Sequence, residues 1–151
     1  MADPKSYIGA LVQAIAAVPG TIDSSGYATL FSGSPSTIGK IITVGPIGDQ
    51  HADITVTTLA GRTLHANGAA DGGNVPIGFA YDPATDAGQQ LMLTNNGTNN
   101  PVSFKITDPD GKITYFYGVI SNFQDNQRDA SSMKGFTFTI RVNNATIRPG
   151  F

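Results

Sequence analysis

The sequence predicts a mainly β fold, a β-sandwich or half-open barrel with one packed α-helix. Gly, Pro, Ser, Thr and Asn account for 63 of the 151 residues, and these residue types favour turns and strands. All eleven acidic residues are Asp, and Glu, a good helix former, does not occur. Several segments alternate apolar and polar residues with a period of two, as half-buried strands do.

The overall composition excludes several classes of protein. Cys is absent, which removes disulfides, thiolate zinc sites and cysteine nucleophiles. Charged residues make up 13% of the chain, about half of what is usual in soluble domains, and the net charge is −2. A chain with only nine Lys and Arg residues lacks the basic face with which proteins bind nucleic acid. A weakly charged surface instead suits a protein whose faces and strand edges are covered by partners.

The chain divides into an N-terminal arm, residues 1–38, and a β domain, residues 39–151. Within the arm, Tyr7–Val18 is apolar but, at twelve residues, too short to span a bilayer. Its apolar residues follow helical spacing, and Pro19-Gly20 ends the pattern, which predicts a short amphipathic helix over Ile8, Leu11, Val12 and Ile15. A Ser/Gly-rich connecting loop follows over 20–38, with one short strand around Tyr27–Phe31.

A secretory signal peptide is the alternative for the same segment. Lys5 precedes the apolar run, and Ala14-Ile15-Ala16 has the small residues of a cleavage site. Asp3 cancels the positive charge of this leader, which favours the helix.

The β domain begins with alternating segments. Strands are predicted at Lys40–Val44, Ala52–Thr58 and Val75–Tyr81, and Pro76 inside the third indicates an edge strand or a strand start. Residues 60–74 contain four Gly-containing turn signals and little to bury. They predict a long mobile loop, or a hairpin extension whose tip orders only against another surface.

A helix and a hairpin are predicted in the second half. Asp82-Pro83 supplies an N-cap and a first helical residue, and Asn95-Asn96-Gly97 ends the helix, whose inner face would carry Ala84, Ala87, Leu91 and Met92. Alternation from Val102 to Thr107, the turn Asp108–Gly111 and the return strand Ile113–Ile120 form a hairpin. The return strand has aromatics on both faces, as a central strand does. A polar connection, 121–133, leads to a final strand, Phe136–Val142.

Motifs for catalysis or metal binding are weak. His51, Asp53 and His65 would form a two-His, one-carboxylate metal site if their strands paired in register, but histidines at strand ends are commonly just solvated. A small hydrolase with a catalytic triad would have to use His51 or His65, and neither is near an obvious nucleophile. Asp108 and Asp110 resemble part of a calcium loop without its Glu, and the turn explains both. We therefore predict no enzymatic activity, no metal and no cofactor.

The exposed aromatics and two tripeptides allow a different class of function. Tyr115 and Tyr117 would form a stacking platform for a sugar, whereas Phe136 and Phe138 fall in the apolar row of the core. The sequons that begin at Asn96 and Asn144 are of a kind common by chance. A secreted sugar-binding β-sandwich, with residues 1–16 removed, is therefore one alternative.

The order of elements from residue 39 onward resembles the tail tube (major tail) proteins of long-tailed, lambda-like bacteriophages. The matching stretches are GKIITVGPIG, ADITVTTLAGRT, AGQQLMLTNNG, VSFKITDPDGKITYFYGVISNF and FTFTIRVNNATIRPG. The resemblance covers residues 39–150. The apolar run in the arm departs from the family's pattern.

The resemblance implies a virion structural subunit that forms hexameric rings stacked into a hollow tube. Such a tube assembles in the host cytoplasm around a tape-measure protein, meets tail terminator and tail-tip proteins at its ends, and conducts DNA without binding it specifically. We expect Asp53, Thr55 and Thr57 to face the lumen, because a DNA conduit should lack cations. Residues expected between rings are in the arm and in the long loop, namely Arg62, His65, Asn67, Asp71 and Asn74. A tube subunit of a contractile injection or type VI-like secretion system shares these expectations.

Overall fold

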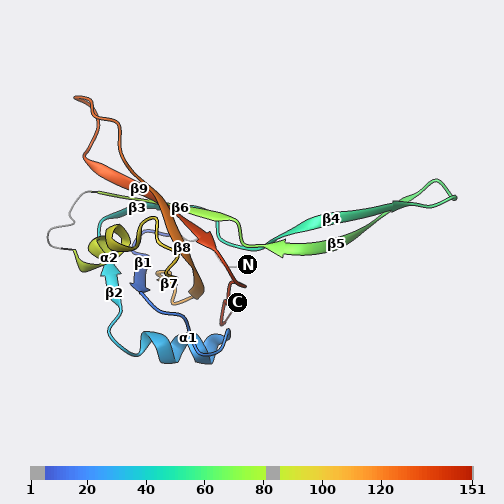
Figure 1. Cartoon of the computed structure of the whole chain (residues 1–151), viewed down its shortest axis with the longest axis horizontal. Helices are drawn as coiled ribbons and strands as arrows, with labels where there is room; N and C mark the ends of the chain where they lie inside the picture. Colours follow the sequence, from blue (N-terminus) through green and yellow to red (C-terminus); the bar gives the residue numbers. More distant parts are fainter. Residues whose placement is uncertain (1–5, 81–85, 151) are drawn as a thin grey trace.

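The computed structural model describes residues 6–80 and 86–150 (Figure 1). Eleven elements follow one another within these residues: β1 Leu11–Ile15, α1 Ser24–Phe31, β2 Ser36–Ile38, β3 Ile41–Val44, β4 Gln50–Thr57, β5 Thr63–Asp71, β6 Asn74–Ala80, α2 Ala87–Asn95, β7 Val102–Thr107, β8 Ile113–Asp125 and β9 Gly135–Val142. The predicted mainly β fold is confirmed, but the described part has two helices instead of one.

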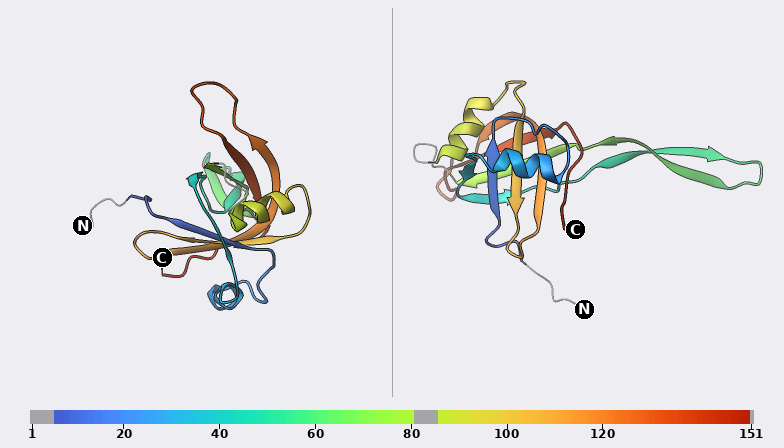
Figure 2. Two further views of the ribbon diagram at one scale, coloured as in Figure 1. Left: turned by 90° about the vertical axis from the view of Figure 1, so that its left-hand side faces the viewer. Right: turned by 90° about the horizontal axis from the view of Figure 1, so that it is seen from below.

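Seven strands form the main sheet, in the order β2-β1-β7-β8-β9-β6-β3, and all neighbouring pairs are antiparallel. The two edge strands, β2 and β3, are consecutive in the chain and joined only by Gly39 and Lys40. Three peptide units from Ile38 to Ile41 reach at most about 11 Å. The two edges therefore lie near each other, and the sheet curls into the half-open barrel visible in Figure 2.

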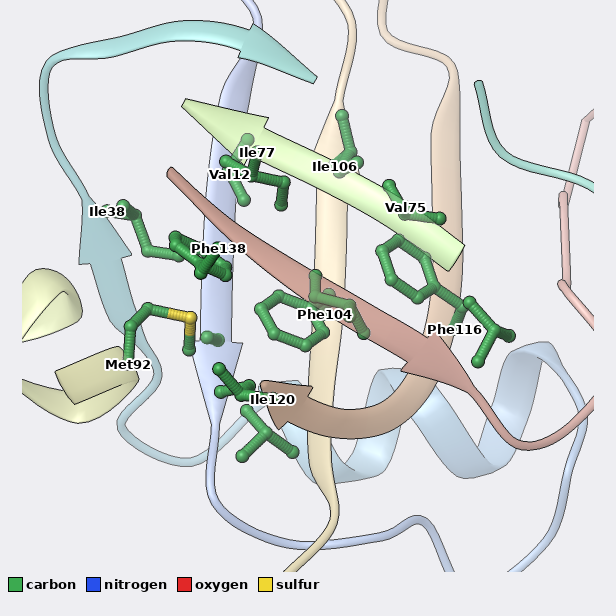
Figure 3. Close-up of a cluster of buried hydrophobic side chains, with 14 of the residues drawn as sticks. Val12, Ile38, Val75, Ile77, Met92, Phe104, Ile106, Phe116, Ile120 and Phe138 are labelled. Carbon is green, nitrogen blue, oxygen red and sulfur yellow. The ribbon is translucent and has the colours of Figure 1, made fainter. Parts of the chain in front are cut away.

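The inner face of the curled sheet holds the main hydrophobic core (Figure 3). Each strand of the sheet except β3 contributes fully buried or nearly buried side chains, and Met92 from α2 covers one end. The rings of Phe104 and Phe116 stack with centroids 5.2 Å apart. The core residues are Val12, Ala14, Ile38, Val75, Ile77, Phe79, Met92, Val102, Phe104, Ile106, Phe116, Ile120, Phe138, Ile140 and Val142.

The predicted hairpin of β7 and β8 is confirmed, including its turn. Asp108 N–H donates to Lys112 O at 2.9 Å, Gly111 N–H donates to Asp108 O at 2.9 Å, and Gly111 has φ 90°. These bonds define a type I turn followed by a glycine bulge, and the positive φ explains why Gly stands there. The final predicted strand is confirmed as β9.

Strand β8 lies at the centre of the sheet and is covered on both faces, as its aromatics predicted. Phe116 points into the main core, while Tyr115 packs beneath α1 on the opposite face. A register shift between Ser121 and Gln124, with Asn122 at φ 56°, inserts one extra residue. This bulge turns Phe123 back toward the core and extends β8 into the predicted polar connection.

The strand predicted at Val75–Tyr81 is β6, and Tyr81 lies outside the described residues. It is not an edge strand, because β6 lies between β9 and β3, but Pro76 does stand near its start. Pro76 is tolerated there for a local reason. Its carbonyl accepts from Gly45 N–H at 2.7 Å, so its backbone faces β3 just beyond Val44, the last residue of that strand. The N–H that Pro76 lacks would also have faced Gly45, beyond the last residue of β3, so the β6–β9 ladder loses no bond.

The predicted amphipathic helix at Tyr7–Val18 is wrong, because residues 11–15 form strand β1 between β2 and β7. Val12 is 2% exposed and Ala14 fully buried, so the buried residues alternate with a period of two. In so short a run the apolar residues fit both the helical period of about 3.6 and the strand period of two. Pairing with β7 makes the segment a strand. The main sheet thus continues across the predicted boundary at residue 38.

The predicted loop over 20–38 contains helix α1 and strand β2, so the short strand expected at Tyr27–Phe31 is wrong. Asp23 caps α1 by accepting from Gly26 N–H at 2.7 Å. Tyr27 and Phe31, four residues apart, pack on the outer face of the sheet against Tyr115. The sequence did not predict this helix, because the segment is rich in Ser and Gly. Only two of its eight residues are buried, which is too few for an apolar stripe at helical spacing.

Helix α2 is confirmed, as is its end at Asn95-Asn96, but its described start differs. The N-cap is Asp86, whose side chain accepts from Gln89 N–H at 3.0 Å, and Asp82-Pro83 lies outside the described residues. The buried residues are Gly88, Gln89, Met92 and Asn95, and Leu91 is partly buried against the main core. The predicted inner face is thus confirmed at Leu91 and Met92 and wrong at Ala87, which is exposed, while Ala84 lies outside the described residues. A Cβ on Gly88 would lie 2.5 Å from Thr37 O, so Gly lets α2 pack directly against β2.

Candidate functional site

The hairpin of β4 and β5 is the most unusual feature of the molecule. These strands pair with each other and, among the described residues, with no strand of the main sheet. They project far from the barrel (Figure 1). Every residue of β4 is exposed, and so is every residue of β5 except Gly68. Residues 60–74 are therefore a hairpin extension, and the alternative of a mobile loop is wrong.

The hairpin has one polar face and one apolar face. Residues directly opposite each other share a face, and the register pairs Asp53 with Asn67, Thr55 with His65 and Thr57 with Thr63. On the other face, Ile54 lies opposite Ala66, and Val56 lies opposite Leu64. The apolar face is exposed, with Ile54 at 57%, Val56 at 59% and Leu64 at 49%. An isolated two-stranded hairpin is marginal in water, and the apolar face of this one is left exposed by the described chain.

A β-bulge lies near the base of the hairpin. The register shifts between His51 and Asp53, where β5 carries one more residue than β4. Gly68 lies at this point, and a Cβ there would approach the Ile54 side chain within 3.1 Å. The bulge adds twist, and twist is typical of two-stranded ribbons.

The tip of the hairpin is a tight, ordered turn. Thr58 N–H donates to Arg62 O at 3.0 Å, Gly61 N–H donates to Thr58 O at 2.9 Å, and Gly61 has φ 82°. This is the same turn that joins β7 to β8. Leu59 stands at its outer corner and is fully exposed. Neither the turn type nor any described contact accounts for a leucine at this position.

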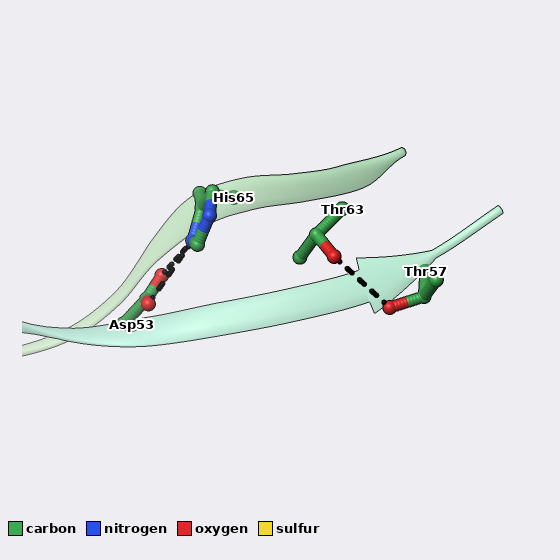
Figure 4. A network of polar contacts seen from close by, with 4 residues as sticks. All are labelled: Asp53, Thr57, Thr63 and His65. Atoms are coloured by element: carbon green, nitrogen blue, oxygen red, sulfur yellow. Dashed lines mark hydrogen bonds and ion pairs between the residues drawn. The ribbon is translucent and has the colours of Figure 1, made fainter. Parts of the chain in front are cut away.

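The polar face carries two cross-strand contacts (Figure 4). The His65 Nδ1 lies 3.1 Å from both carboxylate oxygens of Asp53. The hydroxyls of Thr57 and Thr63 are hydrogen-bonded at 3.1 Å. Both members of the Asp53–His65 pair are about 60% exposed, at 63% for His65 and 62% for Asp53, so the pair aligns the strands more than it stabilises them.

The structure brings most of the predicted site residues together on this hairpin. Asp53, Thr55 and Thr57 share the polar face with His65 and Asn67, which were expected in a separate loop. Arg62 lies in the tip turn. Asp71 lies at the base, where its carboxylate accepts from Gly73 N–H at 2.9 Å, and Asn74 pairs with Arg141 in the main sheet. The apolar face and Leu59 were missed, although the same alternation that marked Thr55 and Thr57 places Ile54 and Val56 opposite them.

The Asp53–His65 pair lacks the surroundings that a catalytic or metal centre has. Active sites are concave, and this pair stands on an exposed ribbon. Within residues 6–80 and 86–150, no three His, Asp, Glu or Cys side chains gather closely enough to hold a metal. His51 lies opposite Ala70, toward the base of the hairpin.

The predicted tyrosine platform for sugars is wrong. Tyr115 is 4% exposed and stacks on Tyr27 of α1, with ring centroids 5.1 Å apart and planes 10° apart. Burial raises the pKa of Tyr115. Tyr117 is half-buried, and its hydroxyl accepts from Asn144 Nδ2 at 3.2 Å. Helix α1 covers the face on which a sugar would have stacked.

A groove of about 950 Å³ opens between the N-terminal segment and the edge strand β3. One wall is formed by residues 6–10, including Tyr7 and Ile8, and the other by residues 41–47. Asp108, Thr114 and Arg148 line it as well. Strand β1 pairs with β2 only from Val12 onward. Residues 6–10 precede this pairing, and the groove opens beside them.

Among the described residues, no helix combines the length and apolarity needed to cross a membrane.

The sequence matches no protein-family model and no curated protein. The fold, however, has counterparts among solved structures. A chain in the cryo-EM structure of the anti-feeding prophage baseplate, symmetrised sixfold, has a TM-score of 0.64 and 12% identity, with complete coverage of both chains, 100% and 100%. A chain in the PVC sheath/tube terminator of an extracellular contractile injection system has a TM-score of 0.62 and 10% identity, covering 96% of this chain and 97% of that one.

A chain from the tail of an empty GTA particle, refined with C6 symmetry, has a TM-score of 0.59 and 16% identity, covering 95% of this chain and 97% of that one. At these identities the likeness concerns the fold alone, and it extends over nearly the whole chain. The predicted tail-tube-like fold is thereby confirmed.

Proposed function

We propose that the protein is a structural subunit of a phage-tail-like tube and completes its fold by pairing with copies of itself. The observation that carries this proposal is the projecting β4–β5 hairpin, with its exposed apolar face and no partner strand in the described chain. Burying Ile54, Val56 and Leu64 against a neighbour would remove apolar area from water in every subunit. The similar folds in a GTA tail and in injection systems support the same role.

A closed ring satisfies the hairpin better than an isolated pair of subunits does. In a head-to-tail ring each copy both offers a hairpin and receives one, so no exposed ribbon edge remains. We propose a hexameric ring, a symmetry that the sixfold baseplate and the C6 tail with similar folds support. Rings of this kind stack into a hollow tube.

The polar face of the hairpin is our candidate for the channel lining. Asp53, Thr55, Thr57, His65 and Asn67 include no Lys or Arg, so this face would not hold DNA phosphates during passage. Thr55→Cys in assembled tubes tests the assignment. A small maleimide should label it while a maleimide too large for the channel should not. Equal labelling by both reagents places Thr55 on the outside.

Arg62, Asp71 and Asn74 remain our candidates for contacts between stacked rings, because they lie at the tip and base of the hairpin. We also propose that a tape-measure protein occupies the channel during assembly and that terminator and tip proteins contact the ends of the tube, in the virion tail.

The particle is either a long-tailed phage or a contractile injection system. The similar folds from two injection systems favour the second, and the GTA tail is compatible with a tail that delivers DNA. Among tube-like folds, a tube subunit polymerises to indefinite length whereas a terminator stops at one ring. The length distribution of assemblies of the purified protein distinguishes these two roles.

A matched pair of double variants tests the function. Ile54→Ser with Val56→Ser changes the apolar face, and Thr55→Ser with Thr57→Ser changes the polar face of the same strand. Because all four side chains are exposed, the thermal unfolding of the barrel should not change. We expect the apolar-face variant to need at least tenfold more protein to assemble, measured by sedimentation velocity. Equal assembly of both variants would contradict the proposal.

A further inference from the structure

We propose that the tip of the β4–β5 hairpin of one copy docks into the groove between residues 6–10 and β3 of a second copy. Leu59 would enter the apolar part of the groove, and Arg62 would approach Asp108. This inference rests on the proposed self-assembly and adds to it which surfaces meet.

The tip has the features of a docking element. Leu59 is fully exposed on an ordered turn, so its position is fixed before binding. The equivalent corner of the β7–β8 turn is occupied by Pro109, a residue that suits this position. A leucine offers the turn no such benefit. Its side chain is unfavourable in water, and burial against a partner would remove this apolar surface from water.

The groove has complementary features. Tyr7 is 78% exposed, Ile8 88% and Ile42 63%, and together they form an apolar patch on its two walls. Strand β3 pairs with β6 on one side only, so its other edge borders the groove without a partner strand in the described chain. The groove therefore offers both apolar contact and open backbone groups.

The charges are complementary as well. Asp108 lines the groove and has no ion-pair partner among the described residues, and burial together with Asp110 raises the pKa of its carboxyl. Arg148, the other charged residue of the groove, donates to Ile47 O at 2.6 Å. Arg62, three residues from Leu59 across the tip turn, likewise has no ion-pair partner within residues 6–80 and 86–150. A cation brought to Asp108 would offset its partly buried charge.

A second copy is the occupant that the geometry supports. The hairpin points away from the barrel that carries the groove, so a chain cannot fill its own groove with its own tip (Figure 1). Tip and groove are different surfaces of one chain, and such a contact is head-to-tail and can repeat. It thus produces a ring or a stack without any further component.

Cross-linking tests the contact, and the chain is suited to it because it has no native Cys. Leu59→Cys protein is mixed under assembly conditions with Ile42→Cys protein that carries a larger tag, and a short bis-maleimide is added. We expect heterodimers to exceed both kinds of homodimer severalfold. In the control mixture Met133→Cys replaces Ile42→Cys, since Met133 is 71% exposed but lies on the β8–β9 connection. This mixture should give no excess.

A second pair of variants tests the same contact without cysteines, in case the cysteine substitutions themselves impair assembly. Leu59→Ser should raise the protein concentration needed for assembly about tenfold, whereas Ala60→Ser in the same turn should not. If wild-type rings or tubes form but no heterodimer excess is seen and both serine variants assemble alike, the docking inference is overturned and the proposed function stands. If the wild-type protein stays monomeric, the proposed function itself fails.

Discussion

Gln89 holds together the seam of the barrel, where β2 passes into β3. Its side chain is 1% exposed, and its Nε2 donates to Gly39 O at 2.9 Å and to Ala80 O at 3.0 Å. Asp86 completes the clamp by accepting from Gly39 N–H at 2.7 Å. One amide thus joins the helix α2, the connection between the edge strands and the end of β6. Its neighbour Gln90 is exposed.

Replacing this amide should weaken the barrel. Gln89→Leu keeps a similar volume but leaves two partly buried carbonyls without their donor, which should lower the free energy of unfolding by about 2 kcal/mol. Gln90→Leu, one residue along the same helix, should change it little. Urea denaturation of both variants measures the difference. Equal stabilities would show that the clamp contributes nothing.

Tyr27 makes stability depend on alkaline pH. Burial, with a smaller contribution from Tyr117, raises the pKa of Tyr27 to about 12. In the unfolded chain a tyrosine titrates near 10, so between these values the native state binds more protons. The contribution of Tyr27 to the free energy of unfolding should therefore be fully present below about pH 10 and be lost as the pH rises toward 12.

Tyr27→Phe should remove part of that pH dependence without cost at neutral pH. The Tyr27 hydroxyl is buried and has no hydrogen-bond partner among the described residues. We expect a flatter stability curve above pH 10 and an unchanged or higher melting temperature at pH 7. Tyr7→Phe, at a tyrosine that is 78% exposed, is the control. A wild-type alkaline slope in Tyr27→Phe would contradict this account.

At the scale of elements, prediction from sequence succeeded where alternation was long or turns were strong. Strands β7, β8 and β9 and the Asp108–Gly111 turn have patterns that only one structure fits. The Tyr7–Val18 run failed because its apolar residues suit both a helix and a strand. The prediction missed helix α1 because two of its aromatic residues hold it by packing on a strand that is distant in the sequence. Local sequence does not contain that information.

Strand β1 gives a direct test of this correction. Val12 is 2% exposed between β2 and β7, whereas Val18 is 45% exposed beyond the end of the strand. Val12→Ala should cost about 2 kcal/mol through lost burial and a small cavity, and Val18→Ala should cost little. Chemical denaturation decides between them. A surface helix or a cleaved leader would instead leave both variants as stable as the wild type.

At the scale of the whole molecule, the barrel encloses its own hydrophobic core, whereas the hairpin leaves its apolar face exposed. The sequence placed Asp53, Thr55 and Thr57 on one face, and the structure adds His65 and Asn67 to that face by register. The apolar face, the exposed Leu59 and the groove could not be recognised beforehand. An apolar residue in a strand is ordinarily assigned to the core, and only the three-dimensional arrangement shows that this ribbon has no core to join.

Negative-stain electron microscopy of the purified protein over a range of concentrations tests the central claim most directly. The account predicts hollow rings or tubes of uniform width above a threshold concentration. It also predicts that the double variant Ile54→Ser and Val56→Ser, folded as judged by thermal unfolding, stays dispersed at that concentration. A wild-type protein that remains a dispersed monomer at every concentration would contradict the account.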